Sequence, residues 1–255
     1  MVSGAFLYEM ELFEYFLDGL PLRTGDIVAT VDGTEVTFRG QVWRLVGAVM
    51  PGDIHHVLMY VGPGPRFIEA GPSGVIEFEM PESRWDSVPV ADSRGGLMDR
   101  LHGVACPLFG KRITGEREAQ VRRAAADYCL AQVGKPYNRR FSDPYREDSF
   151  YCSQLLWRAY RRQGINLRAR GVGGGKRPGR IIFPSDVWRA CLARNASPDT
   201  PVAPGEAEAP SRLEAITDHV AEAVEGVLQV VQDRVADLEQ RVEAPETREA
   251  KTPPT

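Results

Sequence analysis

Three short apolar segments joined by tight turns constrain the fold of this chain more than any other feature. They cover residues 56–62, 66–70 and 75–79, and each has the length and the branched or aromatic content of a β-strand. Gly- and Pro-rich turns at residues 63–65 and 71–74 connect them. Because a parallel crossover needs about a dozen residues or more, connections this short force antiparallel pairing. The sequence therefore predicts a meander of antiparallel strands.

Other segments predict a further hairpin and several helices around this meander. Residues 27–31 are strand-like, and the Asp32-Gly33 step predicts a hairpin with a partner strand over residues 35–39. Helices are predicted where apolar residues recur at helical spacing without interior Gly or Pro. The predicted helices cover residues 5–18, 116–132, 153–160 and 183–188. Together these elements predict an α+β fold in which an antiparallel sheet packs on helices.

The charge distribution divides the chain into a body and a tail. From Asp199 onward there are 5 Lys and Arg residues against 13 Asp and Glu residues, although the whole chain has a net charge of only −4. We predict a domain over residues 1–195, a Pro/Ala/Glu-rich linker over 196–210 and a disordered end over 244–255. Apolar residues in residues 211–243 predict an amphipathic helix that can form a coiled coil, by self-association or with a partner helix.

Composition excludes several classes of protein. The four cysteines, at 106, 129, 152 and 191, have neither disulfide-framework nor metal-site spacing, so we predict a reducing compartment, no metal and no cofactor. No secretory signal and no run long enough for a transmembrane span is present, which predicts a cytoplasmic location, with export by a non-classical route left open. The pI of about 5.7 and basic segments without interleaved aromatic residues argue against nucleic-acid binding.

Cys152 has the sequence setting of a nucleophile. It follows Phe150-Tyr151 and opens a predicted helix, where backbone N–H groups stabilise a thiolate and can hold an oxyanion. The other three cysteines lack this setting, since Cys106 precedes a proline in a predicted loop, and Cys129 and Cys191 lie in predicted helical segments. Cys152 by itself is equally compatible with a buried core thiol.

A base and an orienting group are available on the predicted strands. His55 and His56 stand where the strand over 56–62 begins, and the sequence alone leaves open which of them faces the cysteine. Glu69 lies on the next strand, where a carboxylate can orient an imidazole through its second nitrogen. Cysteine, histidine and carboxylate together are the groups required for acyl transfer through a thiolate.

These motifs, in this order, resemble the permuted papain-like amidases, the YiiX/YaeF-like branch of the NlpC-type cysteine peptidase superfamily. The resemblance rests on His56-Val57-Leu58-Met59-Tyr60, Phe67-Ile68-Glu69-Ala70, Gly134-Lys135-Pro136-Tyr137, Tyr151-Cys152-Ser153-Gln154 and Phe183-Pro184-Ser185-Asp186-Val187. In the unpermuted enzymes the cysteine precedes the histidine, whereas here it follows by roughly a hundred residues. The resemblance spans about residues 20–190 and implies a circularly permuted papain-like fold, followed by a helical tail outside the family pattern.

The resemblance also implies roles for individual residues. Cys152 corresponds to the nucleophile, His56 rather than His55 to the base, and Glu69 to the third member. Tyr137 matches a tyrosine near the site. Gln154 departs from the glutamate that is commoner after Cys-Ser, so its role as a supporting group rests on position alone, beside a reading as a surface helix residue.

The predicted activity is hydrolysis of an amide or ester through an acyl-enzyme on Cys152, with transfer to another acceptor as a variant. A peptide, a lipid amide or another acyl compound is the expected substrate. Two alternatives remain open: a catalytically idle module that binds an anionic or lipid ligand, and an interaction protein assembled through residues 211–243. The basic segment over 158–180 is either a solvated face or a cradle for an anionic group.

Overall fold

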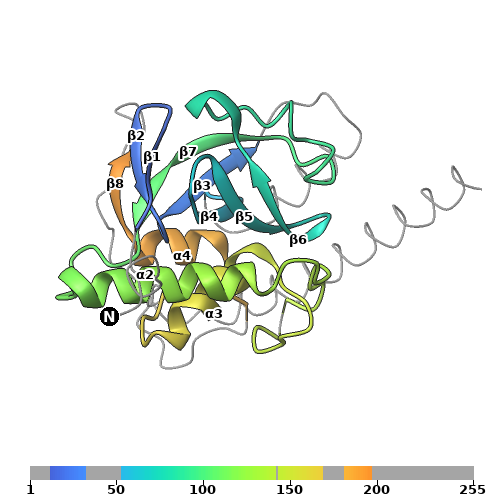
Figure 1. The fold of residues 1–255 in the computed structure, drawn as a ribbon. Helices are drawn as coiled ribbons and strands as arrows, with labels where there is room; N and C mark the ends of the chain where they lie inside the picture. The colour runs from blue at the N-terminus through green and yellow to red at the C-terminus, as the bar shows by residue number, and fades with distance from the viewer. Residues whose placement is uncertain (1–11, 33–52, 142, 169–180, 197–255) are drawn as a thin grey trace, which may run out of the picture.

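The computed structural model describes residues 12–32, 53–141, 143–168 and 181–196. Within these residues the protein is a mixed α+β structure in which helices cover one face of an antiparallel sheet (Figure 1). The strands are β1 (Glu14–Leu17), β2 (Leu20–Arg23), β3 (Ile27–Asp32), β4 (His56–Tyr60), β5 (Arg66–Gly71), β6 (Gly74–Glu79), β7 (Asp99–Cys106) and β8 (Leu192–Ala196). The helices are a 3₁₀ turn η2 (Pro81–Ser83), α2 (Gly115–Leu130), α3 (Cys152–Arg162) and α4 (Pro184–Ala190).

The main sheet has six strands in the order β6-β5-β4-β3-β7-β8, and all neighbours are antiparallel. The predicted meander is confirmed, because β4, β5 and β6 pair in sequence through the Gly/Pro turns. The strand predicted over residues 27–31 is β3, which pairs with β4 so that Thr30 lies opposite His56. The predicted hairpin partner over residues 35–39 lies outside the described residues.

Strands β7 and β8 were not predicted, and they change the setting of two cysteines. Cys106, predicted in a loop, ends β7, and Cys191, predicted in a helix, is the cap residue that follows α4 and leads into β8. The sequence of β7 (DRLHGVAC) contains charged residues and a glycine, so its strand character comes from pairing with β3 rather than from alternation.

The helix predicted over residues 5–18 is wrong where the structure describes it. Glu14–Leu17 is a strand that pairs with Leu20–Arg23 in a two-stranded sheet. The turn between them is Asp18-Gly19, and both residues have positive φ (48° and 76°). An Asp-Gly pair with two positive φ angles is the preferred two-residue hairpin turn, and this local signal overrides the helix-like spacing of apolar residues before it.

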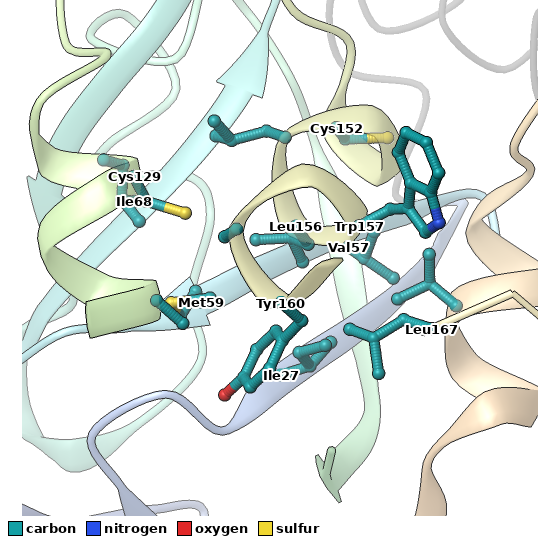
Figure 2. Packing of buried hydrophobic residues seen from close by; sticks show 14 of the residues in the cluster. Ile27, Val57, Met59, Ile68, Cys129, Cys152, Leu156, Trp157, Tyr160 and Leu167 are labelled. Atoms are coloured by element: carbon teal, nitrogen blue, oxygen red, sulfur yellow. The ribbon is translucent and has the colours of Figure 1, made fainter. Parts of the chain in front are cut away.

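The helices α2, α3 and α4 confirm the helices predicted over 116–132, 153–160 and 183–188 within a few residues. The larger apolar core lies between them and the sheet. Figure 2 shows Leu156 and Tyr160 of α3 in this core with Val57 and Met59 of β4. Cys152 is the first residue of α3 and belongs to the same core cluster. The central helix therefore fixes the height of Cys152 relative to β4.

A second apolar cluster fills the other side of the sheet. Leu58 and Tyr60 of β4 and Phe67 of β5 point into it, as the alternation of a strand requires. The segment between β6 and β7 contributes Met80, with Trp85 packed against the cluster. The sheet is thus buried on both faces, by helices on one side and by this segment on the other.

Several predictions fall outside the described residues, among them the linker over 196–210 beyond Ala196, the helix over 211–243 and the end over 244–255. The search of the described residues for a helix long and apolar enough to cross a membrane finds none.

Candidate active site

Cys152 lies at the amino end of α3 and is almost buried. Its residue exposure is 5%, and Tyr151 precedes it as the N-cap in an extended conformation. The backbone N–H groups of Ser153 and Val57 hydrogen-bond to the Cys152 sulfur. A helix N-terminus and two N–H donors favour negative charge on sulfur, so this thiol is in an environment that stabilises a thiolate.

His56 is the first residue of β4 and lies between Cys152 and Glu69. Its Nε2 is 2.8 Å from Oε2 of Glu69, and its ring is also hydrogen-bonded to Cys152. Since Nε2 is engaged by the carboxylate, Nδ1 is the ring nitrogen left for the cysteine. His56 is 8% exposed and Glu69 is fully buried. Three of the residues singled out from the sequence thus form one hydrogen-bonded series.

The charges in this series support one another. Burial alone would raise the pKa of the Cys152 thiol, but the charge and hydrogen bond of His56, with the two backbone N–H groups, lower it below the ordinary value. Burial opposes the charged imidazole too, yet Cys152 and Glu69 raise the pKa of His56. The pair therefore favours thiolate and imidazolium over thiol and neutral imidazole.

An arginine that the sequence analysis missed keeps Glu69 ionised. Arg94 donates from Nε to Oε1 of Glu69 at 2.9 Å and from Nη2 to Oε2 at 2.8 Å. Burial alone would raise the pKa of Glu69, but the charges of Arg94 and then His56 lower it to about 2. No motif distinguishes Arg94 in a single sequence, because it comes from an irregular segment that only the fold brings over β5.

Asp99, at the start of β7, is the second carboxylate on Arg94. Its two oxygens accept from Nη1 and Nη2 of Arg94 at 2.8 and 2.9 Å, and Oδ2 also accepts from the Thr30 hydroxyl at 2.7 Å. Since Thr30 is opposite His56 in the β3–β4 ladder, these contacts return to the strand that carries the imidazole. The buried polar group therefore spans the four strands β3, β4, β5 and β7.

Tyr137 and His55, the other two residues considered from the sequence, have different surroundings. Tyr137 is bridged to Phe150 in the segment that leads to Cys152. Burial first, and the charge of Cys152 second, raise the pKa of Tyr137 well above its usual value, so its hydroxyl keeps its proton next to the sulfur. His55 is partly buried, and its backbone N–H donates to the Thr30 carbonyl at 3.1 Å. The contact with Glu69 is made by His56.

Gln154 is not a surface residue, contrary to one of the two readings of the sequence. It is fully buried, and its Oε1 accepts from the backbone N–H of Tyr151 at 3.1 Å and from Asn138 Nδ2 at 2.9 Å. Its Nε2 donates to the Arg146 carbonyl at 2.9 Å and to the Pro144 carbonyl at 3.3 Å. These four bonds cap α3 and fasten the preceding loop, so Gln154 supports the nucleophile helix by its structure.

Part of the basic segment after Arg158 is paired. Glu147 accepts from both Arg158 and Arg162 of α3, and Arg168 donates to the Ile181 carbonyl at 3.0 Å. These contacts show that the beginning of the segment packs on neighbouring loops. Residues 169–180 lie outside the described part of the chain.

The order of the three groups along the chain and their geometry agree with a known family. Residues 33–174 match the family model described as permuted papain-like amidase enzyme, YaeF/YiiX, C92 family. The matched range is more than half of the chain and contains His56, Glu69 and Cys152.

The chain belongs to this family. No curated protein and no solved structure matches it. Membership in the permuted papain-like amidases agrees with the fold, in which the strand with His56 precedes the helix with Cys152. It assigns the protein to a group of papain-like amidases and peptidases, and the match ends before α4 and the acidic tail.

Proposed function

We propose that this protein is a cysteine hydrolase that cleaves an amide or ester through an acyl-enzyme on Cys152. The observation that carries the proposal is the hydrogen-bonded series from Cys152 through His56 to Glu69, in which the thiol pKa is lowered and the imidazole pKa raised. Such a pair is a preformed nucleophile and acid at neutral pH. The substrate is an acyl compound such as a peptide or a lipid amide.

In the first half-reaction the Cys152 sulfur attacks the carbonyl carbon, and a C–S bond forms as the carbonyl π electrons move to oxygen. The backbone N–H groups at the start of α3 stabilise this oxyanion. His56, as imidazolium, gives its proton to the leaving amine or alcohol as the carbon–nitrogen or carbon–oxygen bond breaks. The product is a thioester and a neutral imidazole.

In the second half-reaction His56 takes a proton from water, and the resulting hydroxide equivalent attacks the thioester. The C–S bond breaks, the acid is released, and the thiolate–imidazolium pair forms again. Glu69 keeps the ring oriented and stabilises its positive charge in both steps. Tyr137, whose phenol stays protonated beside Cys152, supports the intermediate as a hydrogen-bond donor.

The test is the pH dependence of cysteine alkylation, because it requires no known substrate. The full-length protein is labelled with iodoacetamide at a series of pH values, and the labelled sites are mapped by mass spectrometry. We expect Cys152 to react with a midpoint well below the ~8.5 of a free thiol. As the pH falls through this lowered pKa, the thiolate is protonated and labelling is lost.

The other cysteines and one variant provide controls. Burial raises the pKa of Cys129, and it raises that of Cys191 to about 12, so both should label slowly near neutral pH. In His56→Ala the midpoint of Cys152 should move to the free-thiol range or above. If native Cys152 reacts no faster than Cys129, the thiol is not activated, and the idle binding module becomes the better description.

A further inference from the structure

Arg94 is the residue through which the site is joined to the rest of the sheet. Its side chain is fully buried, and it donates to both oxygens of Glu69 and to both oxygens of Asp99. One guanidinium therefore binds two carboxylates, each through two hydrogen bonds. Only arginine has a planar fork of donors with this geometry.

Glu69 needs such a partner to act on His56. An isolated buried carboxyl group would take up a proton, and a protonated carboxyl can no longer act only as an acceptor. With Arg94 on both oxygens, Glu69 remains an acceptor for the Nε2–H of His56. This fixes the tautomer and the plane of the ring, and it leaves Nδ1 facing Cys152.

Asp99 accounts for the charge that Arg94 brings. A second positive charge near His56 would by itself disfavour the imidazolium. Since Asp99 forms its own two-bond pair with Arg94, the two charges offset each other, and the negative charge of Glu69 is left to act on the imidazole. The series Cys152–His56–Glu69 is therefore continued by a neutral arginine–aspartate pair.

The surroundings of Arg94 hold its guanidinium in one orientation. The ring of Phe78 lies 4.9 Å from the guanidinium carbon on β6, and that of Trp85 lies 5.2 Å away. The segment that carries Arg94 is fastened to Asp99, whose backbone N–H donates to Ser87 and whose carbonyl accepts from Ser87 and from the Trp85 indole. The anchors are on β6 and β7, so the fold supplies the position of Arg94 independently of α3.

We propose that Arg94 is a positioning residue of this site, which fixes the Glu69 carboxylate and thereby the ring of His56. Asp99 completes the arrangement by offsetting the charge of Arg94. The inference rests on the proposed role of Cys152 and His56. It adds that activation of the thiol depends on a residue that touches neither the sulfur nor the imidazole.

The experiment compares the pH midpoint of Cys152 alkylation in the full-length native protein, Arg94→Met, Arg94→Gln and Arg94→Lys. In the two neutral variants we expect the midpoint to rise by at least about one pH unit, which corresponds to a roughly tenfold slower reaction on the acidic side. Lysine keeps the charge but not the fork, so Arg94→Lys should lie between the native protein and the neutral variants.

Arg122→Met is the matched control. Arg122 is the other fully buried arginine bound to carboxylates in the described chain, and its partners are Asp26 and Glu118 rather than Glu69. Its loss should lower the melting temperature and leave the Cys152 midpoint unchanged. Cys129 serves as an internal control for folding, because it stays protected in every folded variant.

A folded Arg94→Met or Arg94→Gln protein with the native Cys152 midpoint would overturn the inference. An equal shift in Arg122→Met would also overturn it, because the shift would then report general loosening. If both neutral variants expose Cys129 to alkylation, Arg94→Lys decides by an intermediate midpoint or a native one. A native Cys152 that is not activated overturns the proposed function itself, and this is seen before any variant is compared.

Discussion

The two buried arginines of this protein, Arg94 and Arg122, have the same chemistry and different tasks. Arg122 donates to Asp26 at 2.7 Å, to Glu118 at 2.8 Å and to the Thr24 carbonyl at 3.2 Å, which ties α2 to the turn before β3. Arg94 binds two carboxylates in the same way, but one of them is hydrogen-bonded to His56. A buried ion pair is therefore structural or functional according to what its carboxylate touches next.

Each arginine network also contains a cysteine, and this gives the largest expected effect. Cys152 stands at the end of the Arg94 series, whereas Cys106 accepts a hydrogen bond from Arg122. Replacing Cys152 by Ala should lower kcat on any cleaved amide or ester by at least about 10⁴-fold, because the nucleophile is lost. Cys106→Ala, assayed with the same substrate, should keep native kcat. Equal losses in both variants would erase the distinction between the two networks.

Removing the carboxylate charge should produce the next largest effect. Glu69→Gln keeps the shape of the side chain but permits the wrong imidazole tautomer, so kcat should fall by roughly 10²- to 10⁴-fold. Asp26→Asn is the corresponding change beside Arg122 and should affect stability instead. The two variants are compared by kcat and by thermal unfolding. A stable Glu69→Gln protein with native kcat would contradict the role of Glu69.

Arg122→Met should reverse this pattern. It leaves Asp26 buried without its partner, and breaking a buried ion pair on one side costs about 3–5 kcal/mol of unfolding free energy. Denaturant unfolding measures this loss, and kcat per folded molecule should remain native. A drop in kcat at native stability would place Arg122 in the same functional class as Arg94.

Gln154 provides the smallest and sharpest test, since it lies two residues from Cys152 but bonds away from it. Gln154→Leu leaves the Tyr151 N–H, the Asn138 amide and two loop carbonyls without this partner, and should cost about 1–3 kcal/mol. The alkylation midpoint of Cys152 should stay within a few tenths of a pH unit of native. A shift as large as in Arg94→Met would mean that the loop, rather than the charges, sets the thiol pKa.

Much of the sheet could be predicted from the sequence because its signals are local. Gly/Pro turns a few residues apart define β4, β5 and β6, and the antiparallel order follows from the length of the connections. The failure at Glu14–Leu17 was also local, since the Asp18-Gly19 turn is a hairpin signal that helix-like spacing concealed. Strand β7 had no such signal and is a strand because β3 lies beside it.

The sequence by itself determined which groups are available for chemistry and the order in which they occur: His56, Glu69 and then Cys152 at a helix start. Only the tertiary structure decided that His56 contacts Glu69, that Gln154 is an internal cap, and that Arg94 and Asp99 stand behind the carboxylate. The physical reason is that a local pattern fixes backbone geometry over a few residues. The ionisation of a buried group depends on charges that distant segments bring within hydrogen-bond distance.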